Sequence, residues 1–397
     1  MTQIKHYELG ELADVTKLAG FEFTKYIKYN NYGEIIALRA LNLRHGELDL
    51  TDIKRIDRSV SELLPRSKLY INDILLTYTG NGYGDCAIIE ENDKYHLAPN
   101  ICKIASNVEK VVPYYLYSYI RTNEFYKIMS SHMTGSSQPT IPMKTIRMLP
   151  IPLPPIVVQE KIAEVAYCIN EKIRKNNAIN KNLEQQAQAI FANEFLSLET
   201  LPEGWKQASL IDIADYLNGL AMQKYRPTAD ESGIPVLKIK ELRQGCCDDN
   251  SELCSPNIKF NYIIHDGDVI FSWSGSLLVD LWCGGICGLN QHLFKVTSSK
   301  YDKWFYYAWT KHHLDRFVAV AADKATTMGH IKRDELAKAE VLIPNKKDYD
   351  RIGALLQPIY EMIISNRIEN KKLAATRDTL LPKLMNGEID ISEVDYE

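Results

Sequence analysis

Hydrophobic and small residues recur along residues 153–197 with steps that alternate between four and three positions. Asn176 and Asn180 lie in this pattern and make the alternation continuous. Such spacing is typical of a helix that buries one seam against a second helix. Pro154 and Pro155 can begin this helix but cannot lie inside it. Together with Ala187, the seam positions are Ile162, Ala166, Ile169, Ile173, Asn176, Asn180, Leu183 and Ile190.

A second copy of the pattern follows 190 residues later, so that Asn176 and Asn180 correspond to Asn366 and Asn370. Buried asparagine costs stability but fixes the register of paired helices, so the shared positions favour pairing of the two copies. The alternative is that each amphipathic helix packs on its own domain. Pro358 lies inside the second copy, which predicts a kink or a late start there. The second set of seam positions is Ile352, Leu356, Ile359, Ile363, Asn366, Asn370, Leu373 and Leu380.

The segments that precede the two helices also repeat, with a helix, strands, a glycine turn, an aromatic helix and a polar loop in the same order. In the first copy we expect a short helix at 9–18, strands at 34–41, 71–79 and 87–90, an aromatic helix at 113–129, a polar loop at 135–142 and a strand at 148–152. In the second copy the matching segments are the helix at 210–217, strands at 234–242 and 267–275, the aromatic helix at 301–318, the polar loop at 324–331 and the strand at 341–344. The sequence therefore predicts an α+β fold with two similar mixed α/β modules. The expected domains are 1–152, 153–197, 198–344 and 345–397.

Composition narrows the class of protein. Of the 397 residues, 45% are hydrophobic, which is enough to form hydrophobic cores. The sequence contains no run of eighteen apolar residues, so we expect no membrane-spanning helix. The first twelve residues have no apolar signal-peptide core, and the eight cysteines are scattered, so we expect a reducing cytoplasm. A net charge of -4 argues mildly against an isolated high-affinity nucleic-acid binder.

Sequence motifs for catalysis are few. The DNA-methyltransferase tetrapeptide, Asn or Asp followed by Pro-Pro and an aromatic residue, is absent, as is the GxxxxGK[ST] phosphate loop. The glycine turn at residues 80–84 leads into a strand rather than a helix, so it does not predict a dinucleotide site.

Histidine and cysteine also favour structural roles. For His312 and His313, in an aromatic helix, a structural role is expected. A zinc site is an alternative for five cysteines, but their spacing is unusual and we expect buried, reduced thiols and no metal. These cysteines are Cys246, Cys247, Cys254, Cys283 and Cys287.

Two stretches carry a resemblance to a known family. These are the junction at residues 151–156, where a strand meets Pro-x-Pro-Pro and a long helix, and the C-terminal run 377–389, RDTLLPKLMNGEI. With the duplication, they resemble the specificity subunit of Type I restriction–modification systems over the whole chain. The chain departs from some members in lacking tandem tetrapeptides near residues 183–192.

The resemblance implies two target-recognition domains, each reading half of a split duplex DNA site. It also implies an antiparallel coiled coil, with a pseudo-twofold internal repeat, that spaces the domains and docks two methyltransferase subunits. No catalysis or cofactor is implied for this chain; the partner methyltransferase uses S-adenosylmethionine, and motor–nuclease subunits can join. About forty helical residues span roughly 60 Å, more than one turn of duplex, about 34–36 Å. The alternative function is a coiled-coil adaptor with two protein-binding domains and no DNA readout.

Candidate DNA-binding residues come from loops and strand ends that match between the modules, where Gln, Lys, Ser and Thr suit base-edge readout. In the first module they are Lys25, Arg39, Tyr78, Thr79, Asn81, Ser136, Ser137, Gln138 and Thr140. In the second module they are Lys224, Tyr225, Lys238, Ser272, Trp273, Ser274, Lys324, Thr326, Thr327 and His330.

Overall fold

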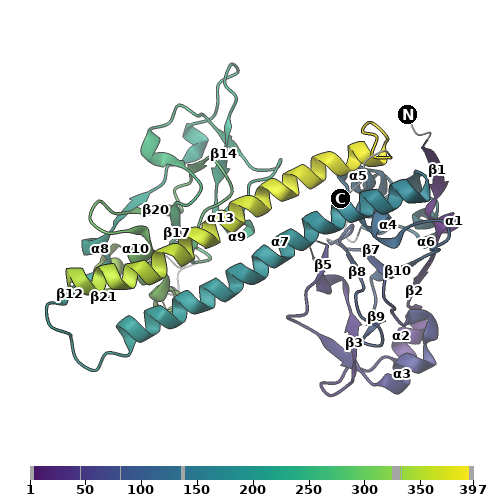
Figure 1. Ribbon diagram of the computed structural model, residues 1–397, viewed down its shortest axis with the longest axis horizontal. Coiled ribbons are helices and arrows are strands. Elements are labelled where there is room, and N and C mark those ends of the chain that lie inside the picture. Colours follow the sequence, from purple (N-terminus) through teal and green to yellow (C-terminus); the bar gives the residue numbers. More distant parts are fainter. Residues whose placement is uncertain are drawn as a thin grey trace. The chain divides into compact units, whose positions relative to one another are not determined.

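The computed structural model describes residues 4–44, 46–80, 82–135, 139–323, 331 and 333–392. The chain divides into two compact units. The first unit comprises Met1–Glu171 and Leu373–Glu397, and the second comprises Lys172–Lys372. Each unit holds one α/β fold and part of each of two long helices, α7 (Ile156–Phe191) and α13 (Lys346–Met385) (Figure 1).

The α/β fold of the first unit is built around a four-stranded antiparallel sheet in the order β2-β10-β7-β8. These strands are β2 (Ala13–Lys17), β10 (Ile101–Ser106), β7 (Ile74–Thr77) and β8 (Cys86–Ile88). A three-stranded sheet has the order β6 (Lys54–Ile56), β3 (Ile35–Leu38) and β9 (Tyr95–Leu97). Two further pairs are formed by β1 (Lys5–Glu8) with β11 (Pro150–Leu153), and by β4 (Leu43–Arg44) with β5 (Glu47–Leu48). The helices are α1 (Leu9–Leu12), α2 (Gly20–Tyr26), α3 (Arg58–Leu63), α4 (Pro113–Ile120), α5 (Asn123–Ser131) and α6 (Met143–Arg147), with short 3-10 turns η1 (Ala40–Asn42) and η2 (Pro65–Ser67).

The second unit repeats this topology, with the sheet order β13-β20-β17-β18. These strands are β13 (Asp215–Asn218), β20 (Leu293–Thr297), β17 (Val269–Ser272) and β18 (Leu278–Leu281). A second four-stranded sheet has the order β15 (Leu253–Cys254), β14 (Ile234–Leu237), β19 (Cys287–Leu289) and β16 (Ile263–Ile264). A two-stranded sheet pairs β12 (Lys206–Ser209) with β21 (Glu340–Ile343). The helices are α8 (Leu210–Ile213), α9 (Ile239–Gln244), α10 (Lys303–His312), α11 (Leu314–Asp323) and α12 (Arg333–Ala337), with 3-10 turns η4 (Met222–Lys224) and η5 (Phe260–Tyr262).

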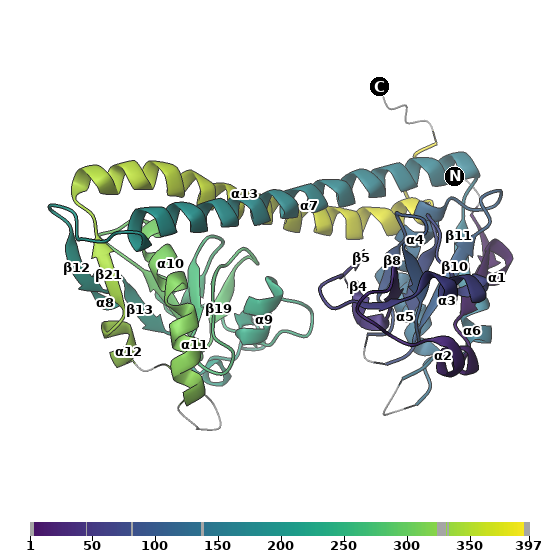
Figure 2. The same cartoon turned by 90° about the horizontal axis from the view of Figure 1, so that it is seen from below.

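The predicted repeat of a mixed α/β module is therefore confirmed. In both copies the strand before the long helix pairs antiparallel with the first strand of the module, β11 with β1 and β21 with β12. In both, one strand of a smaller sheet has a parallel neighbour, β9 beside β3 and β19 beside β14. The aromatic helix α10 packs against β18 and β20 in the second copy. It is followed directly by α11 (Figure 2).

Several predicted elements are shorter than their sequence patterns. The helix expected at residues 9–18 is only the turn α1, after which the chain enters β2. The tyrosine-rich helix expected at 113–129 is two helices, α4 and α5, because the Thr122 hydroxyl accepts a hydrogen bond from the Phe125 amide at 3.2 Å and caps the start of α5. The stretch 301–318 likewise divides into α10 and α11.

Both long helices are continuous. Of the two outcomes predicted for Pro358, a kink or a late start of the second helix, the late start is wrong, because α13 begins at Lys346 and passes through Pro358. Pro358 and Ala354 are both exposed, so the carbonyl freed by the missing proline N–H lies on a solvent-facing side of the helix. α7 ends in a π-helical turn, Ala192–Leu196. Gly387, with φ 71°, takes the left-handed conformation that stops α13.

The long helices contribute directly to the two hydrophobic cores. Ile162 and Ala166 of α7 lie in the first core with Leu384 of α13, whereas Ile352 and Leu356 of α13 lie in the second. This packing explains why each compact unit takes part of both helices, whereas the sequence-based division treats each helix as a domain of its own. Within the described part of the chain, every helix is too short or too polar to span a bilayer.

Candidate nucleic-acid interface

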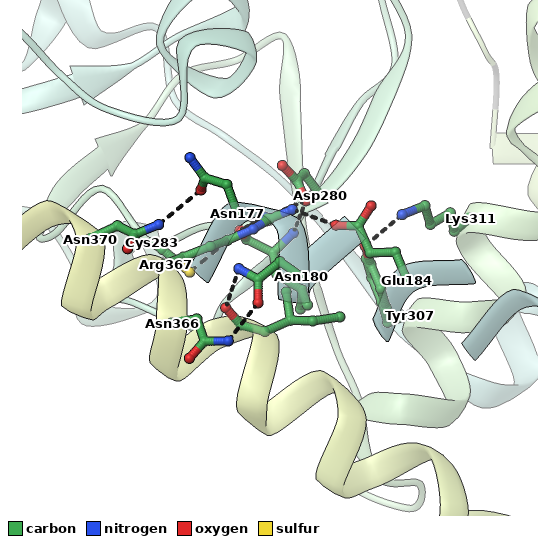
Figure 3. Close-up of polar contacts among 12 residues, drawn as sticks. Asn177, Asn180, Glu184, Asp280, Cys283, Tyr307, Lys311, Asn366, Arg367 and Asn370 are labelled. Carbon is green, nitrogen blue, oxygen red and sulfur yellow. Dashed lines mark hydrogen bonds and ion pairs between the residues drawn. The ribbon is translucent and has the colours of Figure 1, made fainter. Parts of the chain in front are cut away.

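The two long helices run antiparallel within each unit. In the second unit Asn176 donates to Asn370 at 2.8 Å. Asn366 donates to Asn180, also at 2.8 Å (Figure 3). In the first unit Arg377 donates to Asn170 at 2.8 Å. The buried seam positions are Ile162, Ala166, Asn176, Asn180, Ile352, Leu356, Ile363 and Asn366. The half-buried positions are Ile169, Ile173, Leu183, Ile190, Ile359, Asn370, Leu373 and Leu380.

In the first unit the structure brings together two loops that are distant in sequence. The hydroxyls of Thr79 and Thr140 are 2.6 Å apart, and the Gly80 amide donates to the Pro139 carbonyl at 2.8 Å. The Ile141 amide donates to the Tyr78 carbonyl at 3.0 Å. Tyr78 and Thr79 are buried, so their side chains support this loop pair from inside. The other predicted loop residues, Asn81, Ser136, Ser137 and Gln138, lie outside the described residues.

The two basic candidates of the first unit differ in their surroundings. Lys25 is exposed on α2, with its ammonium 5.0 Å from the centre of the Tyr26 ring. Arg39 donates to the Asp52 carbonyl at 2.7 Å and forms an ion pair with the Asp52 carboxylate at 3.1 Å. The Arg39 guanidinium is therefore held against the protein, and a DNA phosphate would have to compete with Asp52 for it.

The second unit joins its corresponding loops in the same way, since the Ile331 amide donates to the Trp273 carbonyl at 3.0 Å. Ser272 is fully buried and donates to the Ser276 carbonyl at 2.8 Å, so its prediction as a direct DNA contact is corrected to a support for the turn. Ser274 is also buried, with its hydroxyl 3.0 Å from Nδ1 of His292. Lys324, Thr326, Thr327 and His330 lie outside the described residues.

The remaining candidates of the second unit lie near the surface. Lys224 and Tyr225 are exposed at η4. Lys238 forms an ion pair with Glu252 at 2.6 Å, which occupies its ammonium as Asp52 occupies Arg39. Trp273 is half-buried, and its indole N–H donates to Asn218 at 3.0 Å.

Sequence reasoning missed an aromatic hollow of about 1070 Å³ in the second unit. Trp273 and Phe294 stack there with ring centres 5.5 Å apart, and Phe260 is 72% exposed. Exposed aromatic rings are platforms on which nucleobases stack. At the corresponding place in the first unit the Lys17 ammonium lies 5.3 Å from the Tyr78 ring centre. Phe260 follows no periodic pattern, so its only sequence signal is an aromatic residue in a polar loop.

His313, Cys254, Cys283 and Cys287 are buried, whereas Cys246 and Cys247, which were also expected to be buried, are half-buried. The His313 ring donates from Nε2 to the Glu340 carbonyl at 2.7 Å, and burial lowers the pKa of this imidazole to about 4. Burial raises the pKa of the Cys254 and Cys283 thiols to about 11, which disfavours the thiolates that bind metals. Among the residues that the structure describes, no three His, Cys, Asp or Glu side chains form a group suited to a metal ion.

Comparison with known proteins defines the class. The Type I restriction modification DNA specificity domain matches this chain twice, over residues 1–188 and 202–375. The chain therefore belongs to the family of Type I restriction–modification specificity subunits, which recognise DNA and are not themselves catalysts. It is a DNA specificity subunit with two copies of the recognition module.

Individual relatives agree with this family. The chain is 26% identical to the MjaIX specificity subunit of Methanocaldococcus jannaschii, over 72% of this chain and 71% of that protein. It is 20% identical to the HindI specificity subunit of Haemophilus influenzae, over 98% of this chain and all of that one. The crystal structure of the Type I S subunit from M. genitalium has the same fold, with a TM-score of 0.57, 13% identity and 96% of both chains covered.

Proposed function

We propose that each α/β fold reads one half of a bipartite duplex DNA site, and that α7 and α13 set the number of unread base pairs between the halves. The observation that carries this proposal is the repetition of one sheet order, β2-β10-β7-β8 and β13-β20-β17-β18. Two copies of one reading fold in a chain suit two half-sites. The length of α7, 36 residues, corresponds to about 54 Å at 1.5 Å per residue, which is more than one turn of duplex DNA.

The reading surface of each fold is proposed to centre on the joined loops at the end of the central sheet. In the first unit these are the loops that meet through Thr79 and Thr140, and in the second the turn after β17. Within this set, exposed Lys25, Lys224 and Tyr225 are direct contacts, whereas buried Thr79 and Ser272 shape the loops. The net charge of -4 suits a chain that reads base edges while its partners supply most phosphate contacts.

The partners are proposed to be two methyltransferase subunits, which bind S-adenosylmethionine and transfer the methyl group, and motor–nuclease subunits that can join them. The exposed side chains on the long helices are the docking candidates: Lys172, Lys175, Gln188, Lys371 and Lys372, of which Lys172 also forms an ion pair with Glu369 at 3.3 Å. Four other polar positions on these helices make contacts inside the chain. Lys161 donates to the Ser392 carbonyl at 2.9 Å. Glu184 pairs with Arg367, Arg377 donates to Asn170, and Tyr360 packs edge-on against Tyr307.

The test is selection of duplexes from a random pool by this chain in complex with its methyltransferase. We expect two short fixed segments with an unread spacer of constant length. Exchange of residues 200–344 for those of another family member should then change one segment and leave the other intact. A single continuous segment, or a change in both segments, would contradict independent readout. A complex that selects no duplex but captures proteins would favour the adaptor alternative.

The docking surface has its own test. Charge reversal of Lys172, Lys175, Lys371 and Lys372 together should abolish co-purification with the methyltransferase. Gln185→Ala, at an exposed residue of α7 outside the candidate set, provides a neutral control. Unchanged stoichiometry of the charge-reversed complex on a sizing column would contradict the assignment of this surface.

A further inference from the structure

Arg367 of α13 joins three elements of the second unit (Figure 3). Its Nη1 donates to Oδ1 of Asp280 on β18 at 2.8 Å and to the Leu281 carbonyl at 3.1 Å. Its Nη2 donates to Oε1 of Glu184 on α7 at 2.9 Å. One guanidinium therefore ties both long helices to the central sheet.

The surroundings of Arg367 hold this geometry rigidly. The Arg367 side chain is 28% exposed, and the side chains of Glu184 and Asp280 are 33% and 25% exposed. Burial by itself would lower the pKa of the guanidinium, but Asp280 and Glu184 hold that pKa above its usual value. Arginine suits this place because its planar fork directs hydrogen bonds along fixed directions, whereas a lysine ammonium is a flexible point charge.

Arg367 contacts β18, which forms an antiparallel hairpin with β17. In this hairpin Val269 is opposite Leu281 and Ser272 is opposite Leu278. The turn of this hairpin carries Trp273 and Ser274, next to the joined loops described above. Arg367 binds at the other end of the hairpin, at Asp280 and Leu281. A small rotation at this end is therefore transmitted along the strands to the turn.

The first unit has no counterpart of this arrangement at the equivalent positions. Ile270 is opposite Asp280 in the second hairpin, and the matching pair in the first is Leu75 opposite Ala87. Ala87 has no carboxylate to receive a guanidinium. The residue that corresponds to Arg367 in the helix repeat is Asn177, which accepts a hydrogen bond from Asn370. At these matching positions, which the structure describes in both copies, only the second α/β fold has the arginine–carboxylate contacts.

We propose that Arg367 is a positioning residue that sets the angle at which the second α/β fold presents its reading loops from the long helices, and thereby selects the length of the unread spacer. This role rests on the proposed function, since it requires a bipartite site. Arg367 touches no base in this role. Its removal should leave the bases read by each half unchanged and alter only the tolerance for spacer length.

The experiment compares complexes of the wild type, Arg367→Met, Arg367→Lys and the control Lys347→Met, which changes an exposed charge on the same helix. Each complex is titrated with duplexes that carry the cognate half-sites at the cognate spacer or at one base pair more or fewer. A second set carries single base substitutions in either half. Thermal unfolding of each variant reports whether it folds, and Arg367→Lys supplies the same comparison if Arg367→Met does not.

We expect Arg367→Met to reduce the preference for the cognate spacer by roughly tenfold, the size associated with loss of a charge-assisted hydrogen bond. Base preferences in both halves should match the wild type, and Lys347→Met should behave like the wild type in every measurement. An equal loss of affinity for every duplex would show a merely structural role and overturn the proposal, as would an unchanged spacer preference. A wild-type complex that has base specificity but no preferred spacer would instead refute the bipartite function itself.

Discussion

The Lys103 ammonium of β10 lies 3.8 Å from the Asp73 carboxylate, and both side chains are more than 90% buried. Lys103 also donates to the Lys68 carbonyl at 2.8 Å, and Asp73 accepts from the Tyr70 amide at 2.8 Å. The second unit repeats this arrangement with Lys295 and Asp268, 2.7 Å apart. The internal repeat therefore includes, in addition to its sheet order, an ion pair between a lysine of the central sheet and an aspartate just before a neighbouring strand; this pair is buried in the first unit and partly buried in the second.

Lys103→Met should destabilise the first unit strongly, because the Asp73 carboxylate would remain buried without its cation. Breaking a buried ion pair from one side costs about 3–5 kcal/mol. Denaturant unfolding of Lys103→Met measures this cost, and Lys144→Met, an exposed lysine on α6, is the control. The double variant Lys103→Met with Asp73→Asn should recover part of the loss. Equal unfolding free energies for Lys103→Met and Lys144→Met would contradict a stabilising pair.

The amides of Asn180 and Asn366 form the buried polar contact of the helix seam. Asn366→Leu should cost about 1–3 kcal/mol, because the Asn180 carbonyl loses its buried donor. Replacing both residues by leucine should restore stability to near that of the wild type, since two apolar side chains then pack together. Unfolding of both single variants and the double variant gives the coupling energy, with Gln188→Leu on the exposed side of α7 as control. Additive losses would contradict a direct Asn180–Asn366 interaction.

The buried His313 imidazole predicts a pH dependence of stability. Its pKa in the folded chain is about 4, below the ordinary value of 6.5, because burial disfavours the charged ring. The unfolded chain binds more protons between these pH values, so the His313 contribution falls as pH drops from about 6.5 to about 4, by about 3 kcal/mol in all. His313→Gln, which keeps a donor for the Glu340 carbonyl but does not titrate, should show a flatter profile. Parallel profiles for the two proteins would show that His313 does not cause the dependence.

The antiparallel helix contacts determine where a length change must be made. Asn170 contacts Arg377 in the first unit, and Asn176 contacts Asn370 in the second. Insertions after Leu183 and after Leu373, which look equivalent in the sequence repeat, would move Asn180 away from Asn366. Insertions of one heptad after Ile173 and after Lys372 lie between the two observed contacts in both helices and preserve every asparagine pair.

These two heptads should lengthen the unread spacer. They add about 10.5 Å, or roughly three base pairs, and rotate one reading fold around the duplex by close to a third of a turn. We therefore expect the same two half-sites at a longer spacer, bound more weakly. Insertion of five residues at each place is the control, because it breaks the seam and should inactivate the protein. Genome-wide mapping of methylated sites decides the outcome, and the original spacer at full activity would show that the helices do not set it.

The sequence by itself determined the features that depend on local periodicity and on repetition. Long helices carry a seam with a regular period, so Asn180 and Asn366 could be predicted to lie at the helix contact. The repeat of 190 residues likewise predicted two similar folds before any strand pairing was known. Element boundaries were less accurate, because a single capping hydroxyl, that of Thr122, ends one helix and begins the next.

Only the tertiary structure decided which polar side chains are available to a ligand. Asp280 and Arg367 are 87 residues apart in the chain, and no periodic pattern connects them, yet one hydrogen bond joins them. The sequence placed Ser272 near the end of a predicted strand and made it a candidate DNA contact, but the structure buries its side chain, and its hydroxyl donates to the Ser276 carbonyl. Burial and pairing at such positions arise from contacts between distant segments, and these contacts depend on how the whole chain packs rather than on the spacing of neighbouring residues.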